Sequence, residues 1–308
     1  MAIPEAADSG VTVAERLHLK LAELTPAERK VARALMAEYP VRGLQPVAKL
    51  AAAAGVSAPT VIRLIGKLAF DSYAGFQRSL KSEVSARLSS PLAVHAGRST
   101  AGQPVTGDGD VLSRAEQVFC DGIRSSFTRL PRSEFEQAVR LLAEPRRNVT
   151  VIGGRFSSML AEYLAASLRM LRPNVHVFST AGADRTSTLL DIGRRDVLVA
   201  FDYRRYQHDT ARAAATAKER GATLIAFTDP YLSPLAAHAD VILTSSVRSP
   251  SPFIALTPAL AMVEAVISAL LDRLGDPALE RMARYDALSA GMVDDADLAD
   301  GGNTGEET

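Results

Sequence analysis

The sequence predicts an all-α N-terminal domain with a helix-turn-helix and a C-terminal α/β domain, whose parallel sheet of about five strands is flanked by helices. Three observations support this division. Two short apolar helical segments meet at a glycine between residues 46 and 70. After residue 148, short β-branched segments alternate with helical ones, as in a parallel sheet covered on both faces. Between these regions, residues 89–110 have the Pro, Gly, Ser and Thr content of a linker.

These patterns divide the chain into four parts. We expect a helix-turn-helix domain over 15–88, a linker over 89–110, a second domain over 111–285 and a disordered acidic tail over 286–308. The tail is assigned by charge, because the residues from Glu280 to the end include eight acids and only two arginines. Residues 25–87 are expected to fold without the rest of the chain.

The first helix expected in the N-terminal domain lies in the segment LTPAERKVARALM. Thr25 suits the N-cap, Pro26 the first helical position, and Glu28 at the third position completes a capping box. The core side of this helix is formed by Leu24, Val31, Leu35 and Met36.

The helix-turn-helix itself is predicted from the segment PVAKLAAAAGVSAPTVIRLIGKLAF. Pro46 suits the first turn of one helix, and Gly55 can end that helix because it has no Cβ to oppose a left-handed conformation. Ser57 then restarts the chain as an N-cap, and we expect its hydroxyl to accept a hydrogen bond from the amide of Thr60.

The outer face of the second helix is the candidate DNA-binding surface. Its inner face is apolar, whereas its outer face is small and cationic, so that it can enter a major groove about 12 Å wide. The candidate DNA-binding residues are Ser57, Ala58, Pro59, Thr60, Arg63 and Lys67. A solvated face on an ordinary helical hairpin is the alternative, but the Gly-Val-Ser turn favours the helix-turn-helix.

The charge of this region supports the same interpretation. Residues 42–87 contain seven Lys and Arg against two acids, a net charge of +5, although the whole chain has 35 basic and 35 acidic residues. A local excess of cations is what binding to DNA phosphates requires.

Several other classes of protein are disfavoured. No apolar run reaches the roughly 18 residues of a membrane span, and the first ten residues do not resemble a secretion signal, so we expect a soluble, cytoplasmic protein. The single cysteine, Cys120, is expected to be buried. No metal site or cofactor is expected, because the histidines are scattered at positions 18, 95, 176, 208 and 238.

The second domain should contain five strands, and helices should separate most of them. The strands are expected at 149–152, 175–178, 196–200, 223–227 and 241–244, and the helices at 156–171, 208–220 and 233–237. A further apolar helix at 256–274 is either a dimer contact or part of the core, and the sequence does not decide between the two.

Two loops of this sheet contain candidate effector-binding residues. Ligands of such sheets bind at the carboxyl ends of the strands. The loop after the first strand contributes Gly154, Arg155, Ser157 and Ser158, and the loop after the third contributes Tyr203, Arg204 and Arg205. Together they could bind an anion through arginines, hydroxyls and helix-start amides. The alternative is a pair of ordinary turns with solvated arginines; Gly-x-Gly-x-x-Gly, the dinucleotide fingerprint, is absent.

Roughly residues 17–275 resemble the RpiR family of bacterial transcriptional regulators, which join a helix-turn-helix domain to a sugar isomerase (SIS) domain. The resemblance is carried by LTPAERKVARALM, KLAAAAGVSAPTVIRLIGKLAFDSYAGFQ, the strand-GGRFSS-helix unit and DVLVAFDYRRYQHDT. It implies a homodimer or homotetramer that binds a double-stranded DNA operator and responds to a small anionic metabolite such as a phosphosugar. The chain departs from the family at FDYRRYQHDT, where SIS domains that bind phosphosugars usually have Ser-x-Ser-Gly-x-Thr.

Two other functions are compatible with the second domain. It could be a sugar-phosphate isomerase, for which Glu162, Glu264 and His208 are the candidate bases, or it could serve only for dimerisation. No pair of these candidates has the spacing of an acid and a base, and an isomerase does not need the N-terminal domain. We therefore expect a regulator rather than an enzyme.

Overall fold

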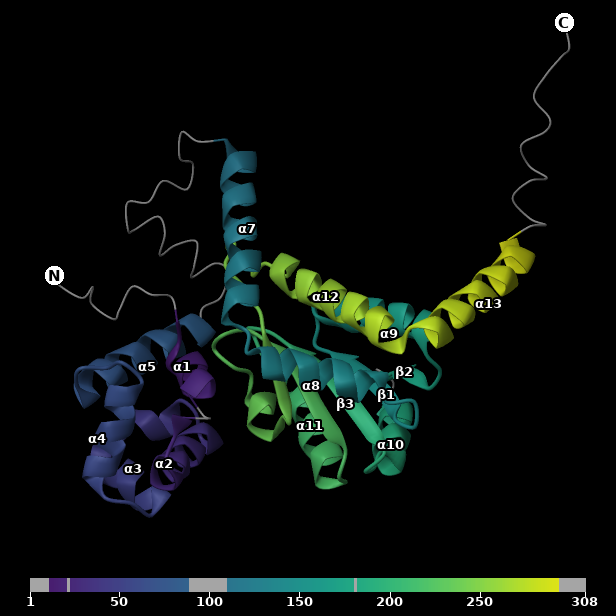
Figure 1. Ribbon diagram of the computed structural model, residues 1–308. Coiled ribbons are helices and arrows are strands. Elements are labelled where there is room, and N and C mark those ends of the chain that lie inside the picture. The colour runs from purple at the N-terminus through teal and green to yellow at the C-terminus, as the bar shows by residue number, and fades with distance from the viewer. Residues whose placement is uncertain (1–10, 21–22, 89–109, 180–181, 294–308) are drawn as a thin grey trace, which may run out of the picture.

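In the computed structural model, the described residues are 11–20, 23–88, 110–179 and 182–293, and they form a helical domain beside an α/β domain (Figure 1). The helical domain contains α1 (Val13–Lys20), α2 (Pro26–Ala37), the 3-10 helix η2 (Val41–Leu44), α3 (Val47–Ala54), α4 (Ala58–Lys67) and α5 (Tyr73–Leu88). The capping box expected at Thr25 and Glu28 is present. The core of the domain includes Val13, Leu17, Val31, Leu35, Leu50, Leu64, Phe76 and Leu80.

The α/β domain begins with two helices and then alternates strands with helices. Its elements are α7 (Val111–Arg129), α8 (Arg132–Ala143), β1 (Asn148–Gly153), α9 (Ser158–Leu171), β2 (Val175–Val177), α10 (Gly182–Asp191), β3 (Asp196–Asp202), α11 (His208–Glu219), β4 (Thr223–Thr228), the 3-10 helix η3 (Pro234–His238), β5 (Val241–Thr244), α12 (Thr257–Leu274) and α13 (Asp276–Val293). The five strands expected from the sequence are confirmed, with ends that shift by at most two residues.

The strands form one parallel sheet in the order β2-β1-β3-β4-β5. Side chains alternate between its faces: Val197 and Val199 pack with α8, α9 and α12, whereas Leu198 and Ala200 pack with α11 and η3. The strand order reverses between β1 and β3, so the helices that follow these two strands, α9 and α11, pack on opposite faces of the sheet, and the edge between them is where such folds bind ligands.

Two expectations need correction. Cys120 is exposed on α7 rather than buried, because that helix stands away from the rest of the domain over its first turns (Figure 1). The tail expected from residue 286 is wrong for residues 286–293, which continue α13; Ala and Leu among them favour a helix despite the nearby acids. Residues 294–308 lie outside the described residues, and so does the linker expected over 89–110, apart from residue 110.

The helix α12, whose role the sequence left open, contributes to the core. Its buried stripe packs against α7, α8 and α9, in the apolar cluster that also contains one face of the sheet. The stripe consists of Pro258, Ala259, Met262, Val263, Val266 and Leu270. Leu260, on another face of the helix, is 38% exposed. Most apolar side chains of α12 therefore belong to the core of the α/β domain.

The short helix α1 joins the two domains. Val13 and Leu17 belong to the helical core, whereas Ala14 packs with apolar residues of the α/β domain. Glu15 is buried and lies 3.7 Å from the guanidinium of Arg129 at the end of α7. One face of α1 thus packs within its own domain and the other against the α/β domain. Within the described residues, no single helix is long and apolar enough to cross a membrane.

Candidate DNA-binding and effector-binding sites

The turn between α3 and α4 has the geometry of a helix-turn-helix. Gly55 has φ 63° and ψ 41°, the left-handed conformation that glycine adopts without steric cost. The amide of Val56 donates to the carbonyl of Ala51 at 3.0 Å, which closes the end of α3. The two helices meet at 101°, within the 90–120° typical of this motif.

The cap of α4 differs from the expectation. The Ser57 hydroxyl makes no capping bond to the backbone; it lies 3.1 Å from the hydroxyl of Thr60, and the Thr60 amide donates to the Ser57 carbonyl at 3.0 Å. The expected bond from the Thr60 amide to the Ser57 hydroxyl is therefore wrong. The physical reason is that Thr60 offers a hydroxyl on the same side of the helix.

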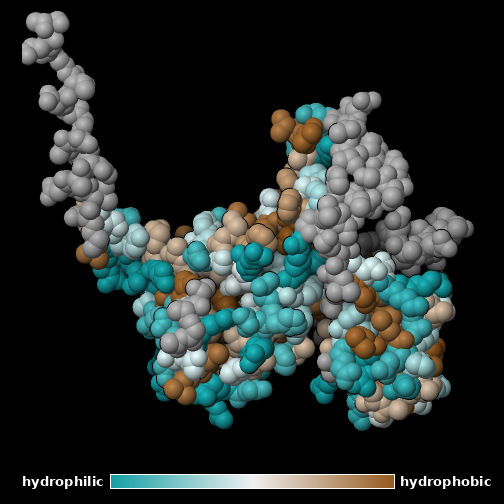
Figure 2. Space-filling model, turned by 180° about the vertical axis from the view of Figure 1, so that it is seen from behind, coloured by the Kyte–Doolittle hydropathy of each residue, from teal (hydrophilic) through white to brown (hydrophobic). Residues whose placement is uncertain are grey.

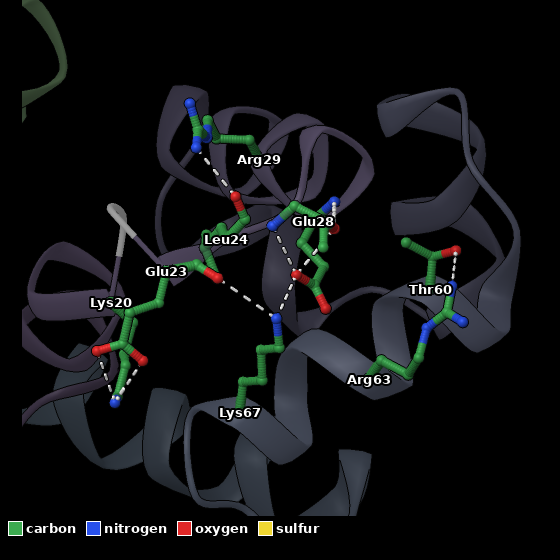
Figure 3. Close-up of polar contacts among 9 residues, drawn as sticks. Lys20, Glu23, Leu24, Glu28, Arg29, Thr60, Arg63 and Lys67 are labelled. Carbon is green, nitrogen blue, oxygen red and sulfur yellow. Dashed lines mark hydrogen bonds and ion pairs between the residues drawn. The ribbon is translucent and has the colours of Figure 1, made fainter.

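The candidate DNA-binding residues divide by exposure. Ser57, Pro59, Arg63 and Lys67 are exposed, and Ala58 is half-buried. Thr60 is buried, and its hydroxyl accepts a hydrogen bond from Arg63 at 3.1 Å (Figure 3). Thr60 therefore orients Arg63 instead of facing outward. The sequence did not single out Ile62, which is 47% exposed.

Lys67 is tied to its own domain. Its ammonium donates to the Glu28 carboxylate at 2.7 Å and to the carbonyl of Glu23 at 3.4 Å (Figure 3). Burial raises the pKa of Glu28, but hydrogen bonds from Lys67 and Thr25 outweigh it and lower that pKa to about 2. The capping box of α2 is thus linked to the last turn of α4.

The two candidate effector loops form one cleft. The loop after β1 and the loop after β3 meet because these strands pair along their whole lengths. The space between them is about 430 Å³ including its open mouth. Six of the seven candidate residues line it, namely Gly154, Arg155, Ser157, Tyr203, Arg204 and Arg205, whereas Ser158 does not.

Five further residues line this cleft that the sequence analysis did not identify as candidates. They are Phe156, Asp202, Gln207, Ile254 and Leu256. The last two come from the segment between β5 and α12, which lies far in sequence from both loops, and no local pattern connects that segment to them.

The paired glycines allow two close approaches, that of the start of α9 to β1 at Gly153 and that of the two loops at Gly154. A Cβ on Gly153 would lie 2.5 Å from the backbone of Ser158, and one on Gly154 would lie 2.9 Å from the side chain of Gln207. Any larger residue at Gly153 would push the start of α9 away from β1.

The hydroxyl of Ser157 is engaged within the fold. It accepts from the amide of Gly154 at 2.9 Å and donates to the carbonyl of Phe201 at 2.8 Å, and the amide of Ser158 donates to the Gly154 carbonyl at 2.8 Å. The bond to Phe201 joins the loop after β1 to the end of β3, and the other two hold the first loop together. The positive charge in the cleft therefore comes from Arg155, Arg204 and Arg205.

Asp202 holds the loop after β3 in place. One of its carboxylate oxygens accepts from the amide of Gln207 at 3.1 Å, and the other accepts from the hydroxyl of Ser233. Burial raises the pKa of Asp202 to about 7, although these hydrogen bonds oppose the shift. Arg205 in the same loop has φ 70°, and the guanidinium of Arg204 lies 4.6 Å from the ring centre of Tyr231.

The candidate bases for an isomerase lie elsewhere. Glu162, Glu264 and His208 do not line the cleft, and Glu264 accepts a hydrogen bond from Tyr163 on the outer side of α9 and α12. Among the residues that the structure describes, Asp202 is the one carboxylate that lines the cleft. Among the described residues no cluster of metal-binding side chains is present.

Comparisons with known proteins match both domains. Residues 11–89 match the helix-turn-helix domain of the rpiR family, and residues 141–269 match the SIS domain. A protein of Haemophilus influenzae named as an uncharacterized HTH-type transcriptional regulator is 21% identical over 228 residues, which cover 72% of this chain and 75% of that protein.

Two solved structures share this fold. The sugar isomerase domain of an RpiR transcription factor from Sphaerobacter thermophilus has a TM-score of 0.55 and 25% identity, covering 58% of this chain and 99% of that one. The NanR protein of Vibrio vulnificus, complexed with ManNAc-6P, has a TM-score of 0.52 and 17% identity, covering 92% of this chain and 100% of that one.

Proposed function

Because this chain belongs to the rpiR family of helix-turn-helix transcriptional regulators and has the SIS domain, we propose that it binds a small anionic, phosphosugar-like metabolite and changes its operator affinity in response. The observation that carries this proposal is the cleft in which the loops after β1 and β3 bring three arginines together. Two arginines can bind a phosphate or carboxylate through paired, charge-assisted hydrogen bonds. ManNAc-6P, with which the Vibrio vulnificus NanR protein is complexed, belongs to the same chemical class.

On the DNA side, we propose that the exposed face of α4 enters the major groove. Arg63 is the side chain best placed to meet a base, with Ser57, Ala58, Pro59 and Lys67 beside it. Thr60 is buried beneath this surface and contributes indirectly, because its hydroxyl orients Arg63. A protein that binds an operator must share a compartment with the DNA, so we place this regulator in the cytoplasm.

We also propose that the protein acts as a homodimer or homotetramer. A helix-turn-helix dimer reaches two half-sites about 34 Å apart, so a small rotation between subunits can lift both recognition helices out of register. Exposed apolar residues suit such contacts: Val111 and Leu112 are 64% and 76% exposed at the free end of α7, where Figure 2 shows a hydrophobic tip, and Leu288 is 69% exposed on α13.

Calorimetry tests the effector site. We expect the wild-type protein to bind at least one member of a panel of phosphosugars and sugar acids that includes ManNAc-6P. The Arg204→Ala, Arg205→Ala variant should bind that compound about a hundredfold more weakly or worse, since each charge-assisted bond contributes about 1.5–3 kcal/mol. The control is Arg212→Ala, an exposed arginine of α11 outside the cleft, which should bind normally.

The same panel separates the alternatives. A wild-type protein that binds none of the compounds would leave the SIS domain as a dimerisation module. A protein that converts one of them into an isomer, as seen by chromatography of the incubated mixture, would be an enzyme.

A gel-shift titration at fixed salt tests the DNA surface. Arg63→Ala should cost about 1–3 kcal/mol of specific binding if this guanidinium reads a base. Unchanged affinity would place the DNA contact on another surface of the domain.

A further inference from the structure

The turn formed by residues 229–233 follows β4. It contacts both the DNA-binding domain and the loop after β3, which we call the effector loop below. On one side it meets residues 202–207, which line part of the proposed effector cleft. On the other side it meets the start of α1 and the end of α2. We refer to it as the 229–233 turn.

Asp229 connects the turn to the effector loop. Its side chain is fully buried and its carboxylate accepts three hydrogen bonds, from the amide of Arg204 at 2.7 Å, the hydroxyl of Tyr206 at 2.9 Å and the amide of Tyr231 at 2.9 Å. Two of these donors belong to the effector loop and one belongs to the turn itself. A shift of the effector loop must therefore displace Asp229 or break a hydrogen bond to this buried carboxyl group.

A second set of bonds connects the same segments. The hydroxyl of Ser233 donates to Asp202, and the hydroxyl of Thr228 donates to the carbonyl of Asp202 at 2.8 Å while it accepts from the amide of Ser233 at 3.0 Å. Both ends of the turn are thus fixed to the end of β3. The cleft and the turn cannot change independently.

The middle of the turn contacts the DNA-binding domain. The carbonyl of Pro230 accepts a hydrogen bond from the hydroxyl of Thr12, directly before α1. Leu232 is 2% exposed and belongs to the apolar cluster that also contains Ala14, with Met36 and Tyr39 packed against it. Leu232 has φ 53°, a conformation that non-glycine residues adopt only where the surroundings enforce it.

We propose that the 229–233 turn transmits effector binding to the DNA-binding domain, and that Asp229 is the positioning residue that ties this turn to the effector loop. This inference rests on the proposed function, since it describes how that effector site would act. An anion bound by Arg204 and Arg205 shifts the loop that Asp229 holds, and the turn passes the shift to α1 and the end of α2. No contact between the effector and the DNA-binding domain is required.

Hydrogen exchange on the full-length protein, without ligand or DNA, tests this coupling. Tyr206→Phe removes one hydrogen bond to Asp229 from a residue that does not line the cleft. We expect amide exchange in α1 and in the last turn of α2 to become about tenfold faster, because a hydrogen bond to a buried carboxyl group is lost. Tyr163→Phe is the matched control, since it removes a tyrosine bond to Glu264 on the outer side of α9.

A substitution on the other side of the turn tests the coupling in the opposite direction. Coupling between two sites is reciprocal, so Thr12→Val, which removes the bond to Pro230, should accelerate exchange in residues 203–207. Unchanged exchange in either direction, or an equal effect of Tyr163→Phe on α1, would overturn the proposal. If the calorimetric test fails, only the proposed effector site is refuted, because the exchange experiment contains no ligand and tests the coupling by itself.

Discussion

Arg63 and Lys67 lie on the same exposed face of α4, but their surroundings differ. Arg63 contacts the hydroxyl of Thr60, whereas Lys67 neutralises the carboxylate of Glu28, whose side chain is 4% exposed. Removing a partner from a buried charge is more costly than removing an exposed cation. The two residues should therefore separate into one that reads DNA and one that also stabilises the domain.

We predict that Lys67→Ala lowers the free energy of unfolding by about 1–3 kcal/mol, because Glu28 loses a charged hydrogen-bond donor. Arg63→Ala should change it by no more than about 0.5 kcal/mol. Urea titrations of the full-length protein, followed by circular dichroism, measure both. Lys67→Arg, which keeps the charge, is the control, and equal stability of the two alanine variants would contradict the structural role of Lys67.

Asp202 should make the stability of the α/β domain depend on pH. Its pKa is raised to about 7 by burial, above the ordinary value of 3.8, so the folded protein retains a proton that the unfolded chain releases. The stabilisation is present below pH 3.8 and is lost as pH rises through about 7. We predict a fall of at most about 1.4 kcal/mol per pH unit across this window, with a shallower fall in Asp202→Asn. Urea unfolding at about pH 5, 6 and 7 measures the free energy of unfolding of both proteins, and an equal change with pH in the wild type and the variant would exclude this role.

At single positions, the sequence predicted the exposure of Arg63 and the cleft position of the arginines, because helical periodicity and strand ends determine both. It did not predict that Lys67 bonds Glu28, or that Ser157 bonds the Phe201 carbonyl. Those partners lie 39 and 44 residues away in sequence, and no local pattern brings them together.

At the level of elements, the helix-turn-helix contains two glycines whose replacement by alanine should change the free energy of unfolding in opposite directions. A Cβ at Gly55 or Gly66 would meet no atom within 4 Å, so only backbone conformation distinguishes the two sites. Gly55 is left-handed at φ 63°, where alanine costs about 1–2 kcal/mol. Gly66 is inside α4, where alanine favours the helix by up to about 1 kcal/mol.

We therefore predict that Gly55→Ala destabilises the protein and that Gly66→Ala does not, as measured by urea unfolding. Gly66→Ala should nevertheless weaken DNA binding in a gel shift, since the added methyl group would lie on the face of α4 that we propose enters the major groove. A stability loss from Gly66→Ala as large as that from Gly55→Ala would contradict the helical assignment of this position.

Strands β1, β3, β4 and β5 were predictable because each is a short apolar run covered on both faces. Helix α1 was not, because its buried residues divide between two domains: Leu17 faces one core and Ala14 the other, and Glu15 between them is buried beside Arg129. A helix that packs on two sides and buries a charge lacks the single apolar stripe by which sequence patterns identify helices.

At the scale of the whole molecule, α1 changes which fragment can fold alone. The sequence suggested residues 25–87, but Val13 and Leu17 are buried in the same core as Leu35 and Leu50. The amide of Val13 also donates to the carboxylate of Glu83 at 2.5 Å, which joins the start of α1 to α5. The minimal folding unit of the DNA-binding domain should therefore begin near residue 11.

We predict that a fragment of residues 11–88 is more stable than one of residues 25–87 by about 3 kcal/mol or more, since the shorter fragment loses the buried aliphatic side chains of Val13, Leu17 and Leu24. The longer fragment should still bind a two-half-site operator more weakly than the full protein, because it lacks the second domain that we propose holds two copies together. Urea unfolding and gel shifts measure the two effects. Equal stability of the fragments would show that α1 serves only the α/β domain, and an affinity of fragment 11–88 equal to that of the full chain would refute dimerisation through the second domain.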